Sequence, residues 1–591
     1  MDKKIVIYHV FTRLFGNTNT NNKPWGTIEE NGVGKFSDFT KKALDEIKDL
    51  GITHIWYTGI PHHAVINDYT EYGISNDDPN VVKGRAGSPY AVKDYYNVNP
   101  DLAIDPKNRL KEFKALIKRT HQAGMKVIID IVPNHVARRY EGKTNPKGVS
   151  DFGYGDDTSV EYQKDNNYYY IPGTEFQTPV WRDGYLPLGG NPINLPDSKL
   201  IEVPAKWTGN GSRSPQPDMN DWYETVRINY GVRPDGGLDF DILPNDFGER
   251  DYKEHYNYWK NKVVPSSWRK FRDVALYWLK MGVDGFRYDM AEMVPVEFWS
   301  FMNSSIKMEN PDAFIMAEVY NPDLYRTYIH KGKMDYLYDK VDFYDGLKHI
   351  MKGYGWSDHI PVVQNGLQDI EHNMLHFLEN HDEQRIASPE FVGNPEIGKP
   401  AMVISATIST SPTMIYFGQE VGEPAAENAG FGSASRTSIF DYVGVPNHQR
   451  WVNDKKFDGG QLKPEEAALR DFYKRLLNFT ITSEALMGAY REIHFYNKEI
   501  TENYNHRVLS YVRWSENQKL IIVSNFDRNV HCSFDLKIPV DIINQWQLSQ
   551  GTYKLKDVLY GHTNSLKIEN GEGHISIELN PLESFIFELK S

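Results

Sequence analysis

The stretch "MGVDGFRYDM" at residues 281–290 is an apolar run that ends in two opposite charges, Arg287 and Asp289. Side chains two residues apart lie on the same face of a strand, so the guanidinium and the carboxylate are expected side by side. A strand that is apolar along its length and charged at its end is typical of a parallel sheet whose strand ends open onto a functional site. The surrounding sequence repeats this pattern.

Short β-rich runs, each followed by a helix-like segment, recur through the first 480 residues. The eight runs are "KIVIYHVF" (4–11), "THIWYTGI" (53–60), "KVIIDIV" (126–132), "VDGFRYD" (283–289), "AFIMAEVY" (313–320), "MDYLYD" (334–339), "MLHFLEN" (374–380) and "TMIYFG" (413–418). Intervening segments such as 39–51 and 108–124 have helical character. Eight βα units predict an α/β fold, a (β/α)8 TIM barrel.

Two departures from the repeat define further domains. About 150 residues rich in Gly, Pro, Asn, Asp and Tyr separate the third and fourth runs, which is too long for a loop. They predict an inserted domain at 136–238 after strand 3, flanked by barrel segments 1–135 and 239–480. Beyond these, alternating strands with turn signals predict a C-terminal antiparallel β-sandwich domain at 481–591.

Composition limits the classes of partner. The 591 residues include 66 basic and 80 acidic side chains, a net charge of −14, and no Lys/Arg run stands out, which argues against nucleic acid. Aromatic residues make up 13% of the chain, and many lie in polar segments, where they suit stacking on sugars or the packing of loops. The sequence gives no indication of the oligomeric state.

Cysteine content and apolar runs bear on the compartment. The single cysteine, Cys532, excludes an intramolecular disulfide framework and a cysteine metal cluster. The start of the chain lacks the apolar core of a signal peptide, and no run approaches the roughly 18 residues that span a membrane. We expect a soluble protein without membrane partners, cytoplasmic as given or exported if a signal peptide has been removed.

Polar residues gather where the predicted strands end. They are Asp130, Asn134 and His135 after the third run, Arg287 and Asp289 after the fourth, Glu318 in the fifth, and Glu379, His381 and Asp382 after the seventh. Each carboxylate taken alone could cap a helix or a loop. Together at one barrel mouth they would perturb one another's pKa values, as acid/base chemistry requires.

Two of these carboxylates suit the cleavage of a glycosidic bond with retention. That reaction needs a nucleophilic carboxylate and a protonated carboxyl about 5–5.5 Å apart, a spacing that adjacent barrel strands can supply. Asp289 and Glu318 end neighbouring strands. Arg287 is expected to keep a neighbouring carboxylate ionised by lowering its pKa, whereas burial after "FIMA" is expected to raise the pKa of Glu318.

Four motifs in this order resemble the signature regions of the α-amylase family of glycoside hydrolases. They are "DIVPNHV" (130–136), "GFRYDMAEM" (285–293), "IMAEVY" (315–320) and "FLENHDEQR" (377–385). "QPDMN" (216–220) is similar to a motif near the end of the inserted domain in oligo-1,6-glucosidase-like and neopullulanase-like members. With the barrel, the insertion and the C-terminal domain, the resemblance covers nearly the whole chain.

The resemblance implies roles for individual residues. Asp289 would be the nucleophile, Glu318 the acid/base, and Asp382 a third carboxylate that binds sugar hydroxyls and stabilises the transition state. His135 and His381 would hydrogen-bond the sugar in the cleavage subsite.

Two further assignments rest on weaker matches. Tyr90 in "SPYAVKDYY" falls at the family's stacking tyrosine, although Ser88-Pro89 replaces the family's preceding "HG". Arg385 matches an arginine that contacts sugar in some subfamilies, with a surface salt bridge as the alternative.

The resemblance implies a retaining hydrolase of α-glucosidic bonds, α-1,4 with α-1,6 left open, in maltooligosaccharides, pullulan or cyclodextrins. Neopullulanase-like or cyclomaltodextrinase-like specificity is favoured. The alternatives are an exo-acting α-glucosidase or oligo-1,6-glucosidase, an α-glucosyltransferase on the same scaffold, and, more remotely, an inactive sugar-binding relative.

No cofactor is expected for the chemistry, and a structural calcium ion is left open, with no metal ligands assigned. Glu292-Met293 stand where many endo-amylases have Lys-His, which puts the amylase-type calcium site in doubt although Asn134 is present. The first βα loop has Lys35 at an expected Asp. Its Asn run could offer oxygen ligands or simply form a turn.

Overall fold

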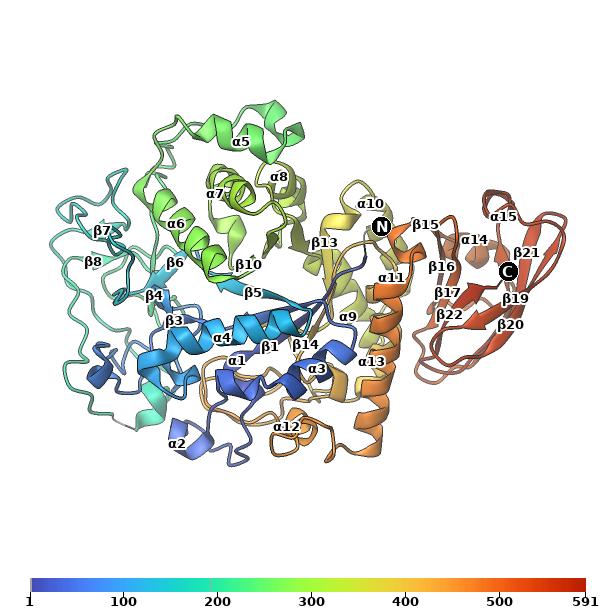
Figure 1. Ribbon diagram of the computed structural model, residues 1–591, viewed down its shortest axis with the longest axis horizontal. Coiled ribbons are helices and arrows are strands. Elements are labelled where there is room, and N and C mark those ends of the chain that lie inside the picture. Colours follow the sequence, from blue (N-terminus) through green and yellow to red (C-terminus); the bar gives the residue numbers. More distant parts are fainter. Residues whose placement is uncertain (1–2, 192, 591) are drawn as a thin grey trace.

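The protein is described by a computed structural model over residues 3–191 and 193–590. Eight parallel strands close into a barrel, and each predicted run forms one of them, which confirms the TIM barrel (Figure 1). The strands are, in order around the barrel, β1 (Val6–Phe11), β2 (His54–Thr58), β5 (Lys126–Ile131), β10 (Gly285–Tyr288), β11 (Phe314–Ala317), β12 (Tyr336–Tyr338), β13 (Met374–Phe377) and β14 (Thr413–Tyr416).

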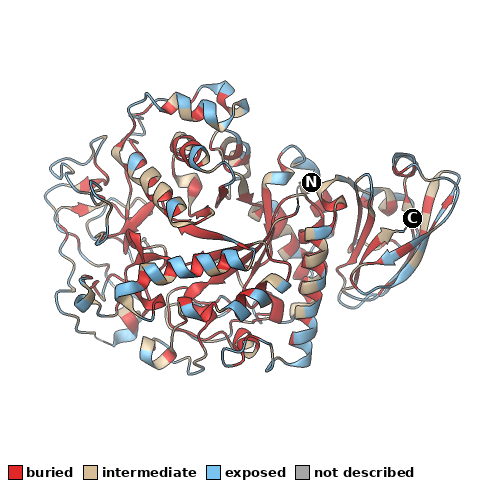
Figure 2. Ribbon diagram, in the orientation of Figure 1, coloured by how far each residue is buried: buried red, intermediate tan, exposed pale blue. Residues whose placement is uncertain are grey.

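Helices surround the barrel and connect its strands. They are α1 (Thr12–Phe15), α2 (Ile28–Asn31), α3 (Lys41–Asp49), α4 (Arg109–Gln122), α5 (Tyr252–Trp259), α6 (Ser266–Met281), α7 (Val296–Glu309), α8 (Tyr325–His330), α9 (Asp345–Met351), α10 (His359–Gly366), α11 (Gly398–Thr407), α12 (Pro446–Val452) and α13 (Pro464–Thr482). The barrel strands are buried, whereas the outer faces of helices such as α4 and α13 are exposed (Figure 2).

Helix α6 illustrates how the local sequence sets this arrangement. Its buried residues Trp268, Phe271, Ala275 and Trp278 recur every three or four positions, which forms one apolar face directed at the core. The helix ends at Gly282, whose φ of 102° is readily adopted only by glycine. This turn leads the chain into β10, the strand that carries Arg287.

The strands in the segment between β5 and β10 are short, at two or three residues each. They form two antiparallel pairs, β6 (His135–Ala137) with β9 (Thr225–Arg227) and β7 (Tyr170–Ile171) with β8 (Ala205–Lys206). A further pair, β3 (Pro61–His63) with β4 (Val92–Val98), belongs to the connection between β2 and β5. In Figure 1 the inserted segment lies at the end of the molecule opposite to the C-terminal sheet.

The C-terminal region forms one continuous antiparallel sheet in the order β15-β16-β17-β22-β19-β20-β21-β18, which confirms an antiparallel all-β domain. Its strands and helices are β15 (Ala489–Glu492), α14 (His494–Ile500), β16 (Val508–Trp514), β17 (Lys519–Asn525), β18 (Cys532–Ile538), α15 (Val540–Gln545), β19 (Gly551–Asp557), β20 (Thr563–Glu569), β21 (Glu572–Leu579) and β22 (Ser584–Leu589). One face of the sheet has an apolar core of its own, whereas Leu509, Leu520 and Ile522 on the other face belong to the core of the barrel.

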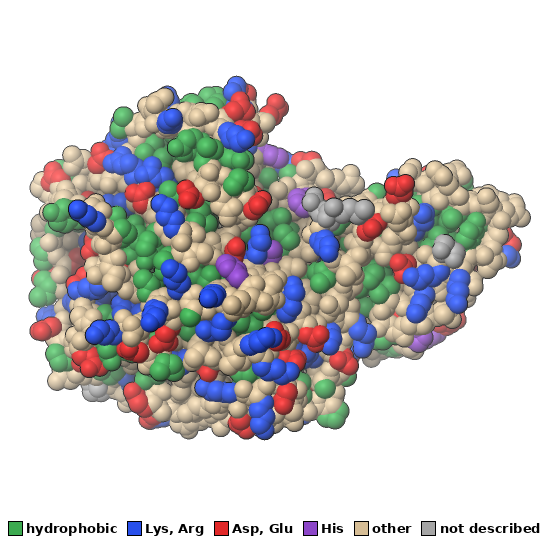
Figure 3. All heavy atoms as spheres, in the orientation of Figure 1, with side chains coloured by type: hydrophobic (Ala, Val, Ile, Leu, Met, Phe, Trp, Pro, Cys, Tyr) green, Lys and Arg blue, Asp and Glu red, His purple; other side chains and the backbone are tan. Residues whose placement is uncertain are grey.

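The surface and the helices bear on partners. Basic and acidic side chains are interspersed over the face shown in Figure 3, without a large basic patch. No helix within residues 3–191 and 193–590 has the length and apolar character needed to cross a membrane.

Candidate active site

The register of two barrel strands brings the two proposed catalytic carboxylates together. Strands β10 and β11 run parallel, with Tyr288 opposite Ala317. Asp289 and Glu318 are the next residues on each strand, so both leave the sheet at the same level and at the same barrel mouth. A backbone hydrogen bond from Glu318 N to Tyr288 O, at 3.0 Å, fixes this alignment.

Arg287 bridges the two carboxylates from inside the barrel. It is fully buried, its Nη1 donates to Asp289 Oδ1 at 2.8 Å, and its Nη2 donates to Glu318 Oε2 at 3.0 Å. Its Nε donates to the Tyr338 hydroxyl at 3.2 Å, and Asp130 Oδ1 lies 3.4 Å from Nη1. Because both carboxylates bind neighbouring nitrogens of one rigid fork, the guanidinium sets their relative position.

A left-handed turn follows Asp289. Met290 has a φ of 47°, an unfavourable conformation for a residue with a long side chain. The turn directs Met290 N to Glu318 Oε2, to which it donates at 3.0 Å. Such strain is often found at functional sites, where the surrounding structure maintains it.

The environment separates the pKa values of the carboxyl groups. Burial raises the pKa of Glu318 to about 7; Arg287 opposes this increase, whereas the nearby Asp289 and Asp382 reinforce it. Burial also resists ionisation of Asp382, but His381, Arg287 and Arg436 outweigh it and lower the pKa of Asp382 to about 2. One group is therefore poised to hold a proton at neutral pH and another to remain charged.

Asp289 differs from the expectation in the net direction of its shift. Burial raises its pKa; Arg287 lowers it as predicted, but Asp382 and Asp130 reinforce the increase. The expected net decrease is wrong because the cost of removing a carboxylate from water exceeds the attraction of one guanidinium here. Burial raises the pKa values of both Asp289 and Glu318, and that of Glu318 reaches about 7, as a proton donor at neutral pH requires.

A cavity of about 510 Å³ opens over these groups. Six of the residues predicted from the sequence line it, namely Tyr90, His135, Asp289, Glu318, His381 and Asp382. A volume of this size suits a small ligand such as one or two sugar rings.

The side chains opposite Asp289 form a connected group. The Tyr90 hydroxyl lies 2.7 Å from His381 Nε2, and their rings stack with centroids 5.1 Å apart. The same His381 nitrogen lies 3.1 Å from Asp382 Oδ2. The His381 side chain is fully buried, whereas that of Asp382 is 44% exposed. His381 therefore orients the Asp382 carboxylate, which remains accessible to a ligand in the cavity.

His135 lies on the other wall of the cavity, against Trp222, with ring centroids 5.3 Å apart. Burial lowers the pKa of His135 to about 3, and the positive charges of Lys83 and Arg227 lower it further, against a hydrogen bond with the Tyr90 backbone. A neutral imidazole at physiological pH can both donate and accept hydrogen bonds, as sugar hydroxyls require.

Arg385 is not brought to the cavity. It is fully buried, its Nη1 donates to Glu379 Oε2 at 2.8 Å, its Nε donates to Thr437 Oγ1 at 2.9 Å, and its guanidinium stacks over Tyr416 at 4.1 Å. Neither the predicted sugar contact nor the surface salt bridge describes this position. The residue holds together the segment after β13 from inside the protein.

Several lining residues were not identified from the sequence. They are Lys83, Ser88, Trp222, Glu224, Thr225, Met290, Tyr320, Lys340, Glu383, Ile439 and Phe440. Lys340 and Glu383, 3.5 Å apart, come shortly after β12 and β13, so the same attention to strand ends could have found them. The loop residues Ile439 and Phe440 gave no comparable signal.

The first βα loop does not fit a calcium site. Asn17 Oδ1 accepts from Asn19 N at 3.1 Å, Asn19 Oδ1 accepts from Asn21 N at 2.8 Å, and Asn22 Oδ1 accepts from Gly444 N at 2.6 Å. Lys35 Nζ donates to Asp101 O at 2.7 Å. These amide oxygens accept from backbone N–H groups of the loop and of Gly444, and they do not converge as an ion's oxygen ligands do.

Polar side chains around Asn134 form hydrogen bonds within the protein. Its amide Nδ2 donates to Gly209 O at 3.0 Å. Glu292 Oε2 accepts from the backbone of Tyr320 and Asn321, each at 3.0 Å. Across the described part of the chain, no group of three or more His, Cys, Asp or Glu side chains is arranged to hold a metal ion.

Comparison with protein families gives two matches. Residues 9–214 and 252–451 match the α-amylase catalytic domain, and residues 500–590 match the α-amylase C-terminal all-β domain. Among curated proteins, α-amylase 3 of Dictyoglomus thermophilum is 20% identical over 546 residues, which cover 89% of this chain and 85% of that protein. Intracellular maltogenic amylase of Bacillus subtilis is 21% identical over 441 residues, 71% of this chain but only 56% of that protein. A cyclomaltodextrinase of a Bacillus species is 20% identical over 90% of this chain and 74% of that protein.

Solved structures share the whole architecture. A maltogenic α-amylase of Thermotoga neapolitana aligns with a TM-score of 0.60 and 18% identity, and the alignment covers 99% of both chains. An α-amylase of Geobacillus thermoleovorans in complex with acarbose aligns with a TM-score of 0.58 and 17% identity, over 100% of this chain and 98% of that one. At this identity the likeness supports the fold and leaves activity to the site and the family.

Proposed function

The chain belongs to the α-amylase family of glycoside hydrolases, and on that premise we propose that it cleaves α-1,4-glucosidic bonds of maltooligosaccharides, cyclodextrins or pullulan with retention of configuration. The observation that carries the proposal is the Arg287 bridge between Asp289 and Glu318, one side chain at each of two adjacent strand ends. This bridge favours a mechanism in which a nucleophile and a proton donor act on the same glycosidic bond.

In the first step, the Asp289 carboxylate attacks the anomeric carbon as the bond from that carbon to the leaving oxygen breaks. The electron pair of the broken bond stays on the leaving oxygen, which takes the proton of Glu318. Because the pKa of Glu318 is raised to about 7, the proton is present at neutral pH. The product of this step is a glycosyl ester on Asp289, with Glu318 ionised.

In the second step, Glu318 accepts a proton from water as the water oxygen attacks the same carbon and the ester bond to Asp289 breaks. Two inversions give net retention. We assign Asp382 to the sugar hydroxyls, because its carboxylate remains charged and exposed in the cavity, with His381 and Tyr90 behind it. Charge held in advance stabilises the oxocarbenium-like transition state without reorganisation.

We further propose a maltogenic or cyclomaltodextrinase-like specificity. The names of two relatives, a maltogenic amylase and a cyclomaltodextrinase, point in this direction. The cavity of about 510 Å³ lies between the inserted segment and the barrel, so residues such as Trp222 and Lys83 would limit the number of sugar units that enter.

Incubation with soluble starch, pullulan, β-cyclodextrin and isomaltose, followed by time-resolved chromatography of the products, tests this assignment. Fast opening of β-cyclodextrin and panose from pullulan would support it. Release of glucose alone from short oligosaccharides would replace it with an exo-acting α-glucosidase, and longer products than the substrate would indicate glycosyl transfer. If none of the four substrates is cleaved by the purified chain, the hydrolase proposal fails.

A further inference from the structure

A second hollow, of about 420 Å³, lies where the inserted segment meets the barrel. Asn134 lines it, whereas the next residue, His135, lines the catalytic cavity. The two cavities are therefore separated by this segment of the chain. We call it the arginine hollow after Arg213, Arg227 and Arg233, which line it together with Trp207 and Glu292. Nothing in the proposed glucan chemistry uses these side chains.

The wall of the arginine hollow carries an excess of positive charge. Its lining includes three arginines and a single carboxylate, Glu292. Glu292 accepts two backbone hydrogen bonds through Oε2, and Arg233 forms an ion pair with Asp239 outside the hollow. Two guanidinium groups therefore face this space without a carboxylate of their own.

Arg227 is the central unsatisfied group. It lies on β9 directly opposite His135, and among the residues that the structure describes its guanidinium has no hydrogen bond or ion pair. Gly211 keeps the space beside it open, because a Cβ at that position would lie 2.9 Å from Arg227 Nη1. The backbone and the side chain together leave room for a ligand on the guanidinium.

Trp207 supplies a second donor without a partner. Its ring stacks on Tyr169 with centroids 4.4 Å apart, and the Arg213 guanidinium lies 4.1 Å from the ring centroid. The residue is only 6% exposed, yet its buried Nε1–H group has no hydrogen-bond partner. A buried donor without an acceptor costs free energy, and a ligand that brings an acceptor removes that cost.

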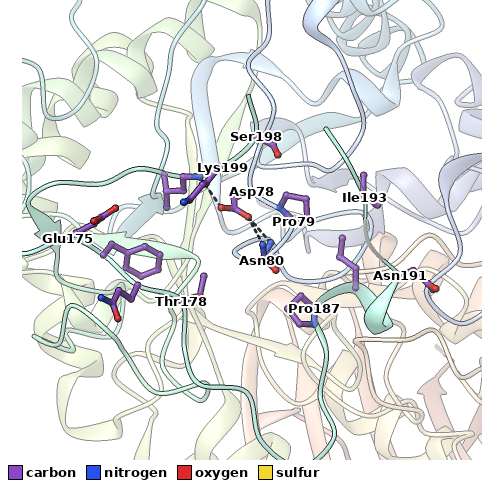
Figure 4. Close-up of a pocket in the computed structure, with 14 residues that line it drawn as sticks. Asp78, Pro79, Asn80, Glu175, Thr178, Pro187, Asn191, Ile193, Ser198 and Lys199 are labelled. Carbon is purple, nitrogen blue, oxygen red and sulfur yellow. Dashed lines mark hydrogen bonds between the residues drawn. The ribbon is translucent and has the colours of Figure 1, made fainter. Parts of the chain in front are cut away.

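The larger hollow shown in Figure 4, about 570 Å³, lacks these features. Of the two carboxylates in its wall, Asp78 and Glu175, Asp78 already accepts from Asn80 N through Oδ1 and from Leu200 N through Oδ2, the latter at 2.8 Å. None of its lining side chains is a buried polar group left without a partner in the described residues. It therefore gives no indication of a particular ligand chemistry.

We propose that the arginine hollow binds a phosphate group, either as inorganic phosphate or as the ester of a small sugar. The guanidinium of Arg227 on its wall has no hydrogen bond or ion pair within the described residues, and the planar guanidinium fork matches the oxygens of a phosphate. The chain has a net charge of −14, so a general attraction of anions to the surface cannot account for binding at this place. Bound phosphate would lie next to the strand that carries His135.

Titration calorimetry of the full chain with inorganic phosphate, in a chloride-containing buffer at pH 7, tests this site. We expect saturable binding at one site, which Arg227→Gln weakens at least about tenfold. Trp207→Phe keeps the stacked ring and removes only the N–H donor, and it should weaken binding about three- to tenfold. The matched control is Arg182→Gln, which removes the same charge from an exposed ion pair with Asp218 in the inserted segment and should leave binding unchanged.

The absence of saturable heat up to about 10 mM phosphate would overturn the proposal, as would equal affinity in the wild type and in both hollow variants. If Arg227→Gln does not fold by circular dichroism, Trp207→Phe decides alone. Glucose 6-phosphate distinguishes the source: tighter binding than inorganic phosphate, lost in the same variants, identifies a sugar ester, and equal binding identifies the free ion. Binding is read without glucan turnover, so its failure leaves the proposed hydrolase untouched.

Discussion

Arg287 Nη1 lies 2.8 Å from Asp289 Oδ1, and both side chains arise from the same strand end, two residues apart. Since the second nitrogen of the same guanidinium binds Glu318 at 3.0 Å, the arginine works as a spacer between two carboxylates as well as a counter-charge. A lysine cannot reproduce this geometry because its ammonium is a single point of charge.

Arg287→Lys is therefore expected to reduce kcat/KM for maltooligosaccharides by about a hundredfold or more, since the two carboxylates lose their common fork. The melting temperature should be recorded alongside the kinetics, because the replaced group is fully buried. A variant that folds normally and retains activity within about threefold of the wild type would show that the bridge does not position the pair.

Replacement of Asp289 by Asn and of Glu318 by Gln should each lower kcat by about ten-thousandfold while the fold remains intact.

The roles of the two carboxyl groups can be separated with a p-nitrophenyl maltoside, whose leaving group departs without a proton. Glu318→Ala should give a rapid burst of nitrophenol with this substrate, and Asp289→Ala should give none. Glu383→Gln is the matched control, since Glu383 lines the same cavity but is paired with Lys340 and Lys348. If either catalytic variant is no more impaired than this control, the assignment is wrong.

The pH profile should reflect the raised pKa of Glu318. A carboxyl with a pKa of about 7 keeps its proton below that pH and loses it above, so kcat/KM should decline tenfold per unit on the alkaline side of about pH 7. Asp382, with its pKa lowered to about 2, remains ionised over the pH range in which activity is measured. It therefore causes no change in kcat/KM near neutral pH. A profile that stays flat to about pH 9 would argue that the acid in the free enzyme is another group.

Chelation should have little effect on stability. The loop asparagines direct their oxygens to backbone N–H groups, and Lys35 occupies a position where a cation ligand was expected. Dialysis against EDTA should leave the melting temperature and the turnover of maltotriose unchanged. A drop in melting temperature that added calcium reverses would reveal an ion site elsewhere.

Arg385 should act on stability rather than on sugar affinity. Its guanidinium and the Glu379 carboxylate are both buried, at 0% and 2% exposure, so removal of one partner leaves the other charge buried without a counter-charge. Arg385→Met is expected to destabilise the fold by about 3–5 kcal/mol, measured by urea unfolding. An increase in KM without a loss of stability would instead restore the predicted sugar contact.

The fold could be derived from the sequence because it is encoded locally. Each barrel strand is a short apolar run of its own, and the longer helices between the strands have a 3.6-residue period, as the spacing of Trp268, Phe271, Ala275 and Trp278 in α6 illustrates. Asp289 and Glu318 could be found by the same reasoning, since the residues that follow barrel strands face the common mouth. In contrast, the pattern gave no information on how deeply a charge would be buried.

Burial and partnership were decided by the tertiary structure. The raised pKa of Asp289 comes first from its burial and then from Asp382 and Asp130, which belong to other parts of the barrel. Arg385 is directed inward, where Glu379 and Tyr416 enclose it. The arginine hollow joins Trp207 and Arg227, twenty residues apart in a segment without periodicity, to barrel residues near Asn134. Local periodicity reports only which face of an element is apolar; which charges meet, and how much water remains between them, is set when distant segments pack together.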